Sequence, residues 1–235
     1  MRKWLFFVAS LFMLASCTVY HPQAVDIPLI NHSGDTRVDA SLSMSTWIGF
    51  ADAINLNATV SHGFNDWLTG QIHANYGGDN YYAQLAPGFY LPLGSNSVFE
   101  FYAGYGYGGA NRNSDNDLEK FSGHYHLPFG QLNLGWHDLS KLHIDLGFGL
   151  KAGAFMPDYE YHKYNSDGTE NLSRYESYKT TNLLLEPQMM FRVGSGNVKL
   201  NLKLGVAFMS DWVNGNGNGM IYDMLTGSIG LTFNL

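Results

Sequence analysis

The feature that most limits what this chain can fold into is a strict alternation of apolar and polar residues along most of its length. Between Val198 and Phe208 every second residue is apolar, and the residues between them are polar or small. A period of two is typical of a β-strand with one apolar and one polar face. Ten segments carry this pattern: 38–44, 54–60, 68–76, 81–91, 99–107, 129–136, 142–152, 183–193, 198–208 and 225–233. The pattern predicts an all-β fold of about ten strands, with a range of eight to twelve.

The lengths of these segments favour strands that cross a membrane. Most are close to the ~9–11 residues that a tilted strand needs to cross a bilayer. The 27 Gly, 15 Tyr and 15 Phe residues suit twisted strands better than helices. We therefore expect a transmembrane antiparallel up-and-down β-barrel, with a soluble β-sandwich as the alternative.

Short and long connections alternate between the predicted strands. Short turns are expected at 62–66, 93–96, 137–140 and 194–197, and most of the connections between them are longer, as at 109–120, 155–178 and 210–219. Outer-membrane barrels have tight periplasmic turns and larger outer loops. An even strand number would place both ends of the barrel sequence on the periplasmic side.

The first seventeen residues look like a lipoprotein export signal. Arg2 and Lys3 precede an apolar run, and Leu14-Ala15-Ser16-Cys17 resembles a bacterial lipobox. The expected organisation is a cleaved signal peptide over 1–16, a lipidated tether over 17–35 that begins at Cys17, and a barrel over 36–235. An ordinary signal followed by an incidental cysteine is the alternative.

Charge excludes one class of partner and points to a polar barrel interior. Without Arg2 and Lys3 the chain has 11 Lys and Arg against 20 Asp and Glu, so its formal charge is 11 − 20 = −9, which does not favour nucleic acid.

We expect a network of paired charges that fills the barrel, and a narrow polar pore is the alternative. The predicted network is Arg37, Asp39, Glu100, Asp145, Lys151, Glu186, Arg192, Lys199 and Lys203.

Enzymatic and metal chemistry have only weak sequence support. Ser122, His124 and His126 could form part of an acyl-ester hydrolase acting on outer-leaflet lipid, but no Gly-x-Ser-x-Gly turn surrounds the serine. Two metal sites are conceivable, an oxygen-rich one over 113–119 and a histidine site that adds His162, and for both a solvated polar loop is the better interpretation. The sequence therefore predicts no catalytic residue, no metal and no cofactor.

The lipobox, the tether and the Gly-aromatic segment over 101–109 together resemble small outer-membrane β-barrel lipoproteins of Bacteroidetes-type bacteria. This resemblance implies an integral outer-membrane protein of a Gram-negative cell. Because no acidic cluster follows Cys17, the anchor is expected on the periplasmic side. Members of this group are largely uncharacterised, so the resemblance implies no chemistry.

The expected function is structural or partner-binding rather than enzymatic. Its partners would be membrane lipid and a protein bound by the outer loops, or a larger outer-membrane complex to which the barrel docks. Tyrosine covers contact area at a small entropic cost, so loop tyrosines are the predicted contacts. These are Tyr159, Tyr161, Tyr164, Tyr175 and Tyr178.

Overall fold

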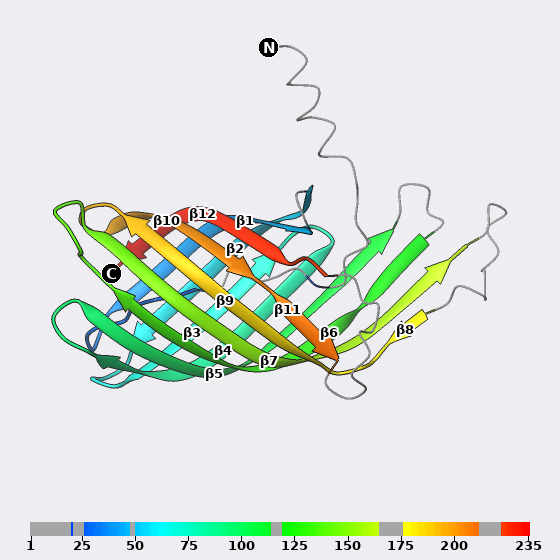
Figure 1. Ribbon diagram of the computed structural model, residues 1–235, viewed down its shortest axis with the longest axis horizontal. Coiled ribbons are helices and arrows are strands. Elements are labelled where there is room, and N and C mark those ends of the chain that lie inside the picture. Colours follow the sequence, from blue (N-terminus) through cyan, green and yellow to red (C-terminus); the bar gives the residue numbers. More distant parts are fainter. Residues whose placement is uncertain (1–19, 21–25, 48–49, 114–118, 165–175, 212–221) are drawn as a thin grey trace, which may run out of the picture.

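The structure is a computed structural model, and it describes residue 20 and residues 26–47, 50–113, 119–164, 176–211 and 222–235. These residues form one antiparallel sheet that closes on itself as a barrel (Figure 1). The strands are β1 (Thr36–Trp47), β2 (Phe50–Gly63), β3 (Leu68–Tyr76), β4 (Asn80–Pro92), β5 (Ser97–Asn113), β6 (Glu119–Trp136), β7 (Ile144–Lys163), β8 (Glu176–Tyr178), β9 (Asn182–Val193), β10 (Val198–Val206), β11 (Phe208–Asp211) and β12 (Leu225–Asn234).

The barrel has ten strand positions around its circumference. β10 and β11 are one strand interrupted at Ala207, and both pair with β9, while the three-residue β8 only extends the sheet beside β7. β7 pairs directly with β9, and β12 pairs with β1 to close the cylinder. The prediction of an all-β, up-and-down antiparallel barrel of about ten strands is therefore confirmed.

The barrel has two different ends. Four short connections, 64–67, 93–96, 137–143 and 194–197, lie at the end where β1 begins and β12 finishes, which we call the turn end. The opposite end, which we call the loop end, carries the connections that follow β1, β3, β5, β7 and β11. In Figure 1 the turn end is on the left and the loop end on the right.

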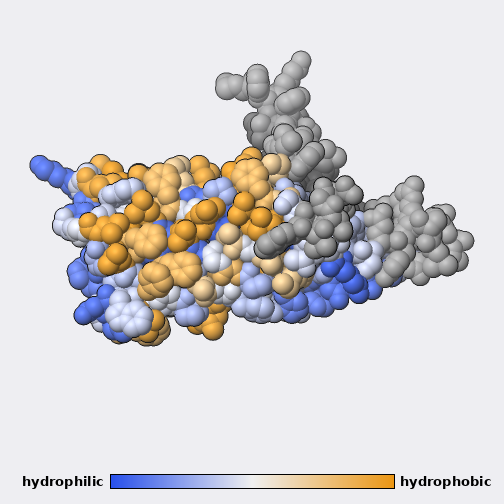
Figure 2. All heavy atoms as spheres, turned by 60° about the horizontal axis from the view of Figure 1, so that its bottom comes forward, coloured by the Kyte–Doolittle hydropathy of each residue, from blue (hydrophilic) through white to orange (hydrophobic). Residues whose placement is uncertain are grey.

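The outer wall is apolar over the barrel and hydrophilic at its ends. Many side chains that point outward from the strands are large, apolar and exposed, for example Leu56 on β2 at 58% and Leu85 on β4 at 59%. Figure 2 shows hydrophobic residues spread over the barrel, with hydrophilic residues gathered at the left end and at the lower right. Further members of this apolar belt are Leu42, Ile54, Ile72, Leu132, Leu150, Leu202, Leu204 and Ile229.

Three strands are longer at the loop end than the sequence predicted. The expected loops over 109–120 and 155–178 are partly strand, because β5 reaches Asn113, β6 begins at Glu119 and β7 reaches Lys163. In this extension the alternation is inverted: Phe121 and Tyr159 point inward and are buried, whereas Ser122 and His124 point outward. An inward apolar stripe with an outward polar stripe stabilises the extension as a sheet above the belt.

Glycines on β5 make room for aromatic rings inside the barrel. A Cβ on Gly106 would lie 2.1 Å from the hydroxyl oxygen of Tyr82, and a Cβ on Gly108 would lie 2.5 Å from the ring of Tyr125. Neither approach is possible for a larger residue without moving the ring. The Gly-aromatic segment over 101–109 therefore lets the rings lie flat against the wall.

Among the residues that the structure describes, no helix is long and apolar enough to cross a membrane. The described part of the predicted tether also packs differently from a free linker. Tyr20, Ile27, Leu29 and Ile30 are all at most 1% exposed, and they lie inside the barrel. The sequence analysis did not anticipate this placement.

Candidate functional site in the barrel lumen

A segment of the chain itself occupies the lumen. Residues 26–30 are buried, and their backbone is held by side chains from three walls. Gln131 of β6 donates to the carbonyl oxygen of Asp26 at 2.9 Å, and Arg192 of β9 donates to the carbonyl oxygens of Ile27 at 2.7 Å and Pro28 at 3.1 Å. The carboxylate of Glu100 on β5 accepts the Ile30 N–H at 2.7 Å. We call residues 26–31 the lumen segment.

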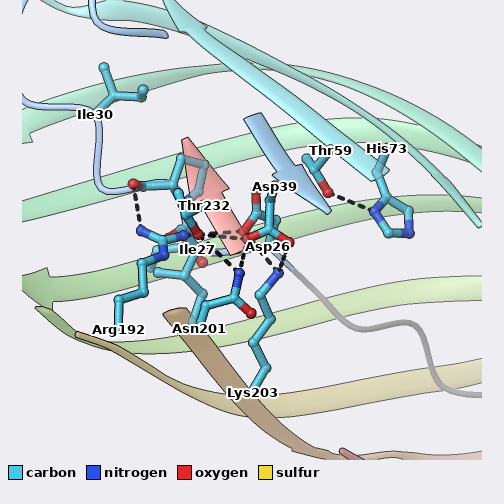
Figure 3. A network of polar contacts seen from close by, with 12 residues as sticks. Asp26, Ile27, Ile30, Asp39, Thr59, His73, Arg192, Asn201, Lys203 and Thr232 are labelled. Atoms are coloured by element: carbon cyan, nitrogen blue, oxygen red, sulfur yellow. Dashed lines mark hydrogen bonds and ion pairs between the residues drawn. The ribbon is translucent and has the colours of Figure 1, made fainter. Parts of the chain in front are cut away.

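The lumen segment carries its own charge into a paired network. The Asp26 carboxylate lies 3.2 Å from Lys203 Nζ and 3.3 Å from Arg192, and Lys203 also contacts Asp39 at 2.8 Å. Asn201 and Thr232 donate to the remaining oxygen of Asp39. Figure 3 shows these side chains from β1, β9, β10 and β12 gathered around Asp26 and Asp39. Charges buried in this way are tolerated only when they are paired and hydrogen-bonded.

A second polar group surrounds Lys151 nearer the loop end. Lys151 Nζ donates to Gln84 at 2.8 Å and to the Tyr82 hydroxyl at 3.2 Å, and lies 4.0 Å from Glu186. It also lies 4.3 Å from the centre of the Phe129 ring, a cation–π contact. Glu186 in turn accepts a hydrogen bond from the Tyr20 hydroxyl at 2.8 Å.

The predicted charge network therefore falls into separate groups. Asp39, Arg192 and Lys203 join around Asp26, Lys151 and Glu186 join near Tyr20, and Glu100 holds Ile30 and Asn133. Asp145 pairs with Lys199 at 2.7 Å near the turn end. Eight of the nine predicted residues are buried; the remaining one, Arg37, is half-buried and lines a cavity at the turn end.

This turn-end cavity has a volume of about 420 Å³ and is lined by His32, Asp35, Arg37, His137 and His143 among others. Asp138 also lines it, and contacts Lys199 at 3.3 Å and His143 at 3.1 Å. Burial raises the pKa of Asp138, but the hydrogen bond with His143 and the charge of Lys199 outweigh burial, so this pKa lies below its ordinary value. Burial, aided by repulsion from Arg37, lowers the pKa of His137.

The loop-end half of the lumen is filled by aromatic rings. Tyr20 lies 5.0 Å from Phe155 and 5.6 Å from Tyr125, measured between ring centres, and Tyr125 stacks on Tyr82 at 5.9 Å. Phe121 stacks on Tyr159 at 4.8 Å. Edge-to-face and offset arrangements at these distances are favourable. These side chains fill the described part of the lumen at the loop end.

The predicted hydrolase residues do not assemble into a catalytic group. Ser122, His124 and His126 all lie on the outward face of β6, and in the described part of the chain no hydrogen bond joins Ser122 to either histidine. His126 instead bonds the Tyr105 hydroxyl, and both histidine rings pack near Tyr107. They form an aromatic patch on the outer wall.

The predicted contact tyrosines divide between wall and lumen. Tyr159 is fully buried in β7, and Tyr161 and Tyr178 are partly buried against the aromatic cluster, so these three are not exposed loop residues. The reason is that the expected loop is strand up to Lys163 and again over β8, which pairs with β7. Tyr164 stacks on His162 at 6.5 Å, and Tyr175 lies outside the described residues.

Two further sequence predictions lie wholly or partly outside the described residues. Cys17 and the signal peptide belong to residues 1–19, and the oxygen-rich segment over 113–119 is largely in the undescribed range 114–118. Within the described ranges, no three His, Cys, Asp or Glu side chains converge in a way that could hold a metal ion.

Sequence reasoning missed the residues that organise the lumen, above all Asp26. One signal was present: Ile27, Leu29 and Ile30 are large aliphatic residues in a segment interpreted as an extended tether. Three aliphatic side chains beside a carboxylate are unusual for a linker in water, because linkers are generally polar.

Comparison with known proteins finds no matching family and only weak similarity to solved structures. No protein-family model matches the chain, and no curated protein matches it. Among solved structures, the chain is similar to Ail, the attachment invasion locus protein of Yersinia pestis, with 12% identity over 86% of this chain and 99% of that one, at a TM-score of 0.30. It is also similar to a bacterial polysaccharide outer membrane secretin, with 10% identity over 88% and 99% of the chains, at a TM-score of 0.25. These values are too low to carry an argument, so the fold rests on the strand pairing.

Proposed function

We propose that this protein is an integral outer-membrane β-barrel whose lumen is closed by its own N-terminal segment, and that it works as a non-enzymatic, partner-binding protein. The single observation that carries the membrane location is the opposition between the two faces of the wall. Apolar side chains in the belt are about half exposed, while the charges inside are buried and paired. A bilayer provides the apolar surroundings that such a belt needs.

Two arginine substitutions test this location. Leu85 lies in the belt and is 59% exposed, whereas Leu93 lies in the β4–β5 turn and is 51% exposed. In a membrane barrel, Leu85→Arg should cost about 2–4 kcal/mol near the bilayer centre, and Leu93→Arg should cost little. The measurement is the yield of heat-modifiable barrel in the outer-membrane fraction. Equal yields from both variants, with the protein recovered in the soluble fraction, would contradict the proposal.

The filled lumen supports a closed barrel rather than a pore. The lumen segment crosses the turn-end half, and the aromatic cluster fills the loop-end half. Barrels of about ten strands are generally filled by side chains, whereas water-filled channels belong to larger barrels. The purified protein should therefore give no stepwise conductance in planar bilayers. Regular conductance steps that Lys203→Glu shifts in ion preference would favour the pore instead.

Partner binding is proposed for the loop-end extension of β6 and β7. Its outward face carries polar side chains such as His124, Asp158 and Glu160, which stand above the apolar belt. Co-purification from mild detergent should recover a companion protein with the parent chain and less of it with His124→Ala/Asp158→Ala. His143→Ala, an exposed histidine at the turn end, is the matched control.

The non-enzymatic part of the proposal has its own test. Purified protein should release no acyl chain from labelled lipid A or phospholipid, since no hydrogen bond joins Ser122 to a histidine among the residues that the structure describes. Release by the parent but not by His126→Ala would replace this proposal with an outer-leaflet hydrolase. Lipidation at Cys17 is proposed from the lipobox, and labelling with radioactive fatty acid should disappear in Cys17→Ala.

A further inference from the structure

The direction in which the N-terminal segment runs through the barrel has a consequence for where the chain begins. Tyr20 lies at the loop end. Its carbonyl oxygen accepts the Asp223 N–H at 3.0 Å, and it forms a parallel bridge with Tyr222, just before β12 starts. Its ring packs on Tyr125 and Phe155, which belong to the loop-end halves of β6 and β7.

The following described residues lie progressively closer to the turn end. Asp26 contacts Lys203 in the middle of β10, and Ile30 bonds Glu100, near the turn-end start of β5. Asn31 and His32 donate backbone N–H groups to Asp35, and Gly34 bonds Gly63 at the turn-end limit of β2. β1 then starts back toward the loop end at Thr36. The described residues, Tyr20 and then 26–34, therefore mark one passage through the lumen before the chain enters the wall.

The wall is shaped to hold this passage. Each of the three aliphatic side chains of the lumen segment lies against a glycine of the barrel. A Cβ on Gly147 would lie 2.9 Å from Ile27 Cγ2, one on Gly135 would lie 2.4 Å from Leu29 Cδ2, and one on Gly63 would lie 2.8 Å from Ile30 Cγ2. Three glycines on three strands thus provide the space that the segment fills.

We infer that the chain is threaded through its own barrel, that the part preceding Tyr20 leaves at the loop end, and that acyl chains on Cys17 insert into the outer leaflet of the membrane. Tyr20 is three positions after Cys17, and an extended chain covers at most ~3.6 Å per position, so the two α-carbons lie within about 11 Å. An anchor on the turn-end side would require the chain to cross the filled lumen again. This inference reverses the periplasmic anchor expected from the sequence, and its lipid part rests on the proposed function.

Three insertions of the same short epitope test which end the N-terminus shares. One tag is placed between Thr18 and Val19, one between Gly217 and Asn218 in the connection after β11, and one between Ser195 and Gly196 in a turn-end turn. Antibody binding to intact and permeabilised cells is measured for each. We expect the N-terminal tag to be accessible whenever the 217–218 tag is accessible, and the 195–196 tag to bind antibody only after permeabilisation.

The inference is overturned if the N-terminal tag binds antibody under the same conditions as the 195–196 tag rather than the 217–218 tag. If the 195–196 tag binds antibody on intact cells and the 217–218 tag does not, the barrel has the opposite orientation in the membrane, which contradicts the outer-leaflet position of the acyl chains. In that case, an N-terminal tag with the same accessibility as the 217–218 tag still supports threading. If the protein is soluble and binds antibody at every position, the proposed membrane location fails. Threading is then decided by the crosslink described next.

A designed disulfide tests the passage directly. A Cβ on Gly147 would lie 3.6 Å from the Ile27 Cβ, which is within the range that a disulfide spans. The Ile27→Cys/Gly147→Cys variant is oxidised, denatured and labelled with PEG-maleimide, with and without prior reduction. The unreduced sample should bind two fewer PEG-maleimide groups, because the disulfide blocks both introduced thiols. Ile27→Cys/Gly135→Cys is the mismatched control, because Gly135 faces Leu29, and it should bind the same number before and after reduction. Equal labelling of the first pair in heat-modifiable protein would overturn the threaded path.

Discussion

The turn-end and loop-end halves of the lumen are walled by the same strands but are filled by opposite chemistry. Near the turn end, charged side chains close around Asp26 and the lumen segment, and the aliphatic residues of that segment meet glycines. Near the loop end, aromatic rings from four strands and Tyr20 fill the space. The first half depends on complete charge pairing, and the second depends on shape. The two halves should therefore fail in different ways when they are mutated.

The largest effect is expected from breaking the buried charge network. Lys203→Met leaves Asp39 without its cation and removes one of the two cations beside Asp26. An uncompensated buried charge costs about 3–5 kcal/mol, so the free energy of unfolding should fall by about that amount. Urea titration of the detergent-solubilised barrel, followed by tryptophan fluorescence, measures the change.

The control for this prediction removes the charges together. Asp39→Asn/Lys203→Met removes one anion and one cation and leaves Asp26 paired with Arg192, and replacing buried ions as a pair is often close to neutral. It should recover most of the stability that Lys203→Met loses. If the double variant is as unstable as the single one, packing rather than charge pairing determines the stability of this half.

The next largest effect is expected from overfilling the aromatic half. Gly106→Ala would place a Cβ 2.1 Å from the Tyr82 hydroxyl oxygen, which also bonds Lys151. Overpacking of this kind costs about 1–3 kcal/mol. Gly130→Ala on β6 is the matched control, because its nearest neighbour would be 3.9 Å away. Equal unfolding midpoints for the two variants would show that the rings adjust without cost.

The same comparison explains what the sequence could and could not predict. The barrel strands were recognisable because their outward residues are apolar and their inward residues polar, a local pattern of period two. The loop-end extension was missed because Phe121, Tyr125 and Tyr159 invert that pattern, with apolar residues inside and polar residues outside. Strand length beyond the belt was therefore underestimated.

The lumen segment was missed for a different reason. Asp26 contacts Arg192, which is 166 positions away in the sequence, and no local periodicity marks such a contact. The inward charges could be named from the strand pattern, but their grouping depends on which walls face each other across the closed cylinder. Arg37 shows this limit, since it lines the turn-end cavity and, in the described part of the chain, forms no direct ion pair with the other predicted charges.

A smaller effect, confined to the turn end, is expected on acidification. The folded-state pKa of Asp138 lies below the unfolded value, so its stabilising contribution is complete above the unfolded pKa and is lost as the pH falls through the folded pKa. Asp138→Asn should therefore flatten the loss of stability below about pH 4 relative to the parent. Urea midpoints measured between pH 6 and pH 3 check this, with Asp35→Asn as a neighbouring control. An unchanged slope would mean that Asp138 does not contribute.

The smallest effect is expected from an ion pair at the loop end. Lys179 lies 3.2 Å from Asp158, but these side chains are 62% and 47% exposed. Exposed pairs of this kind are worth about 0–1 kcal/mol, because water solvates both partners when the pair is broken. Lys179→Met makes the same chemical change as Lys203→Met, so the two unfolding midpoints can be compared directly. A large loss for Lys179→Met would mean that charge pairing also stabilises the aromatic half, and the contrast between the two ends would then be one of degree.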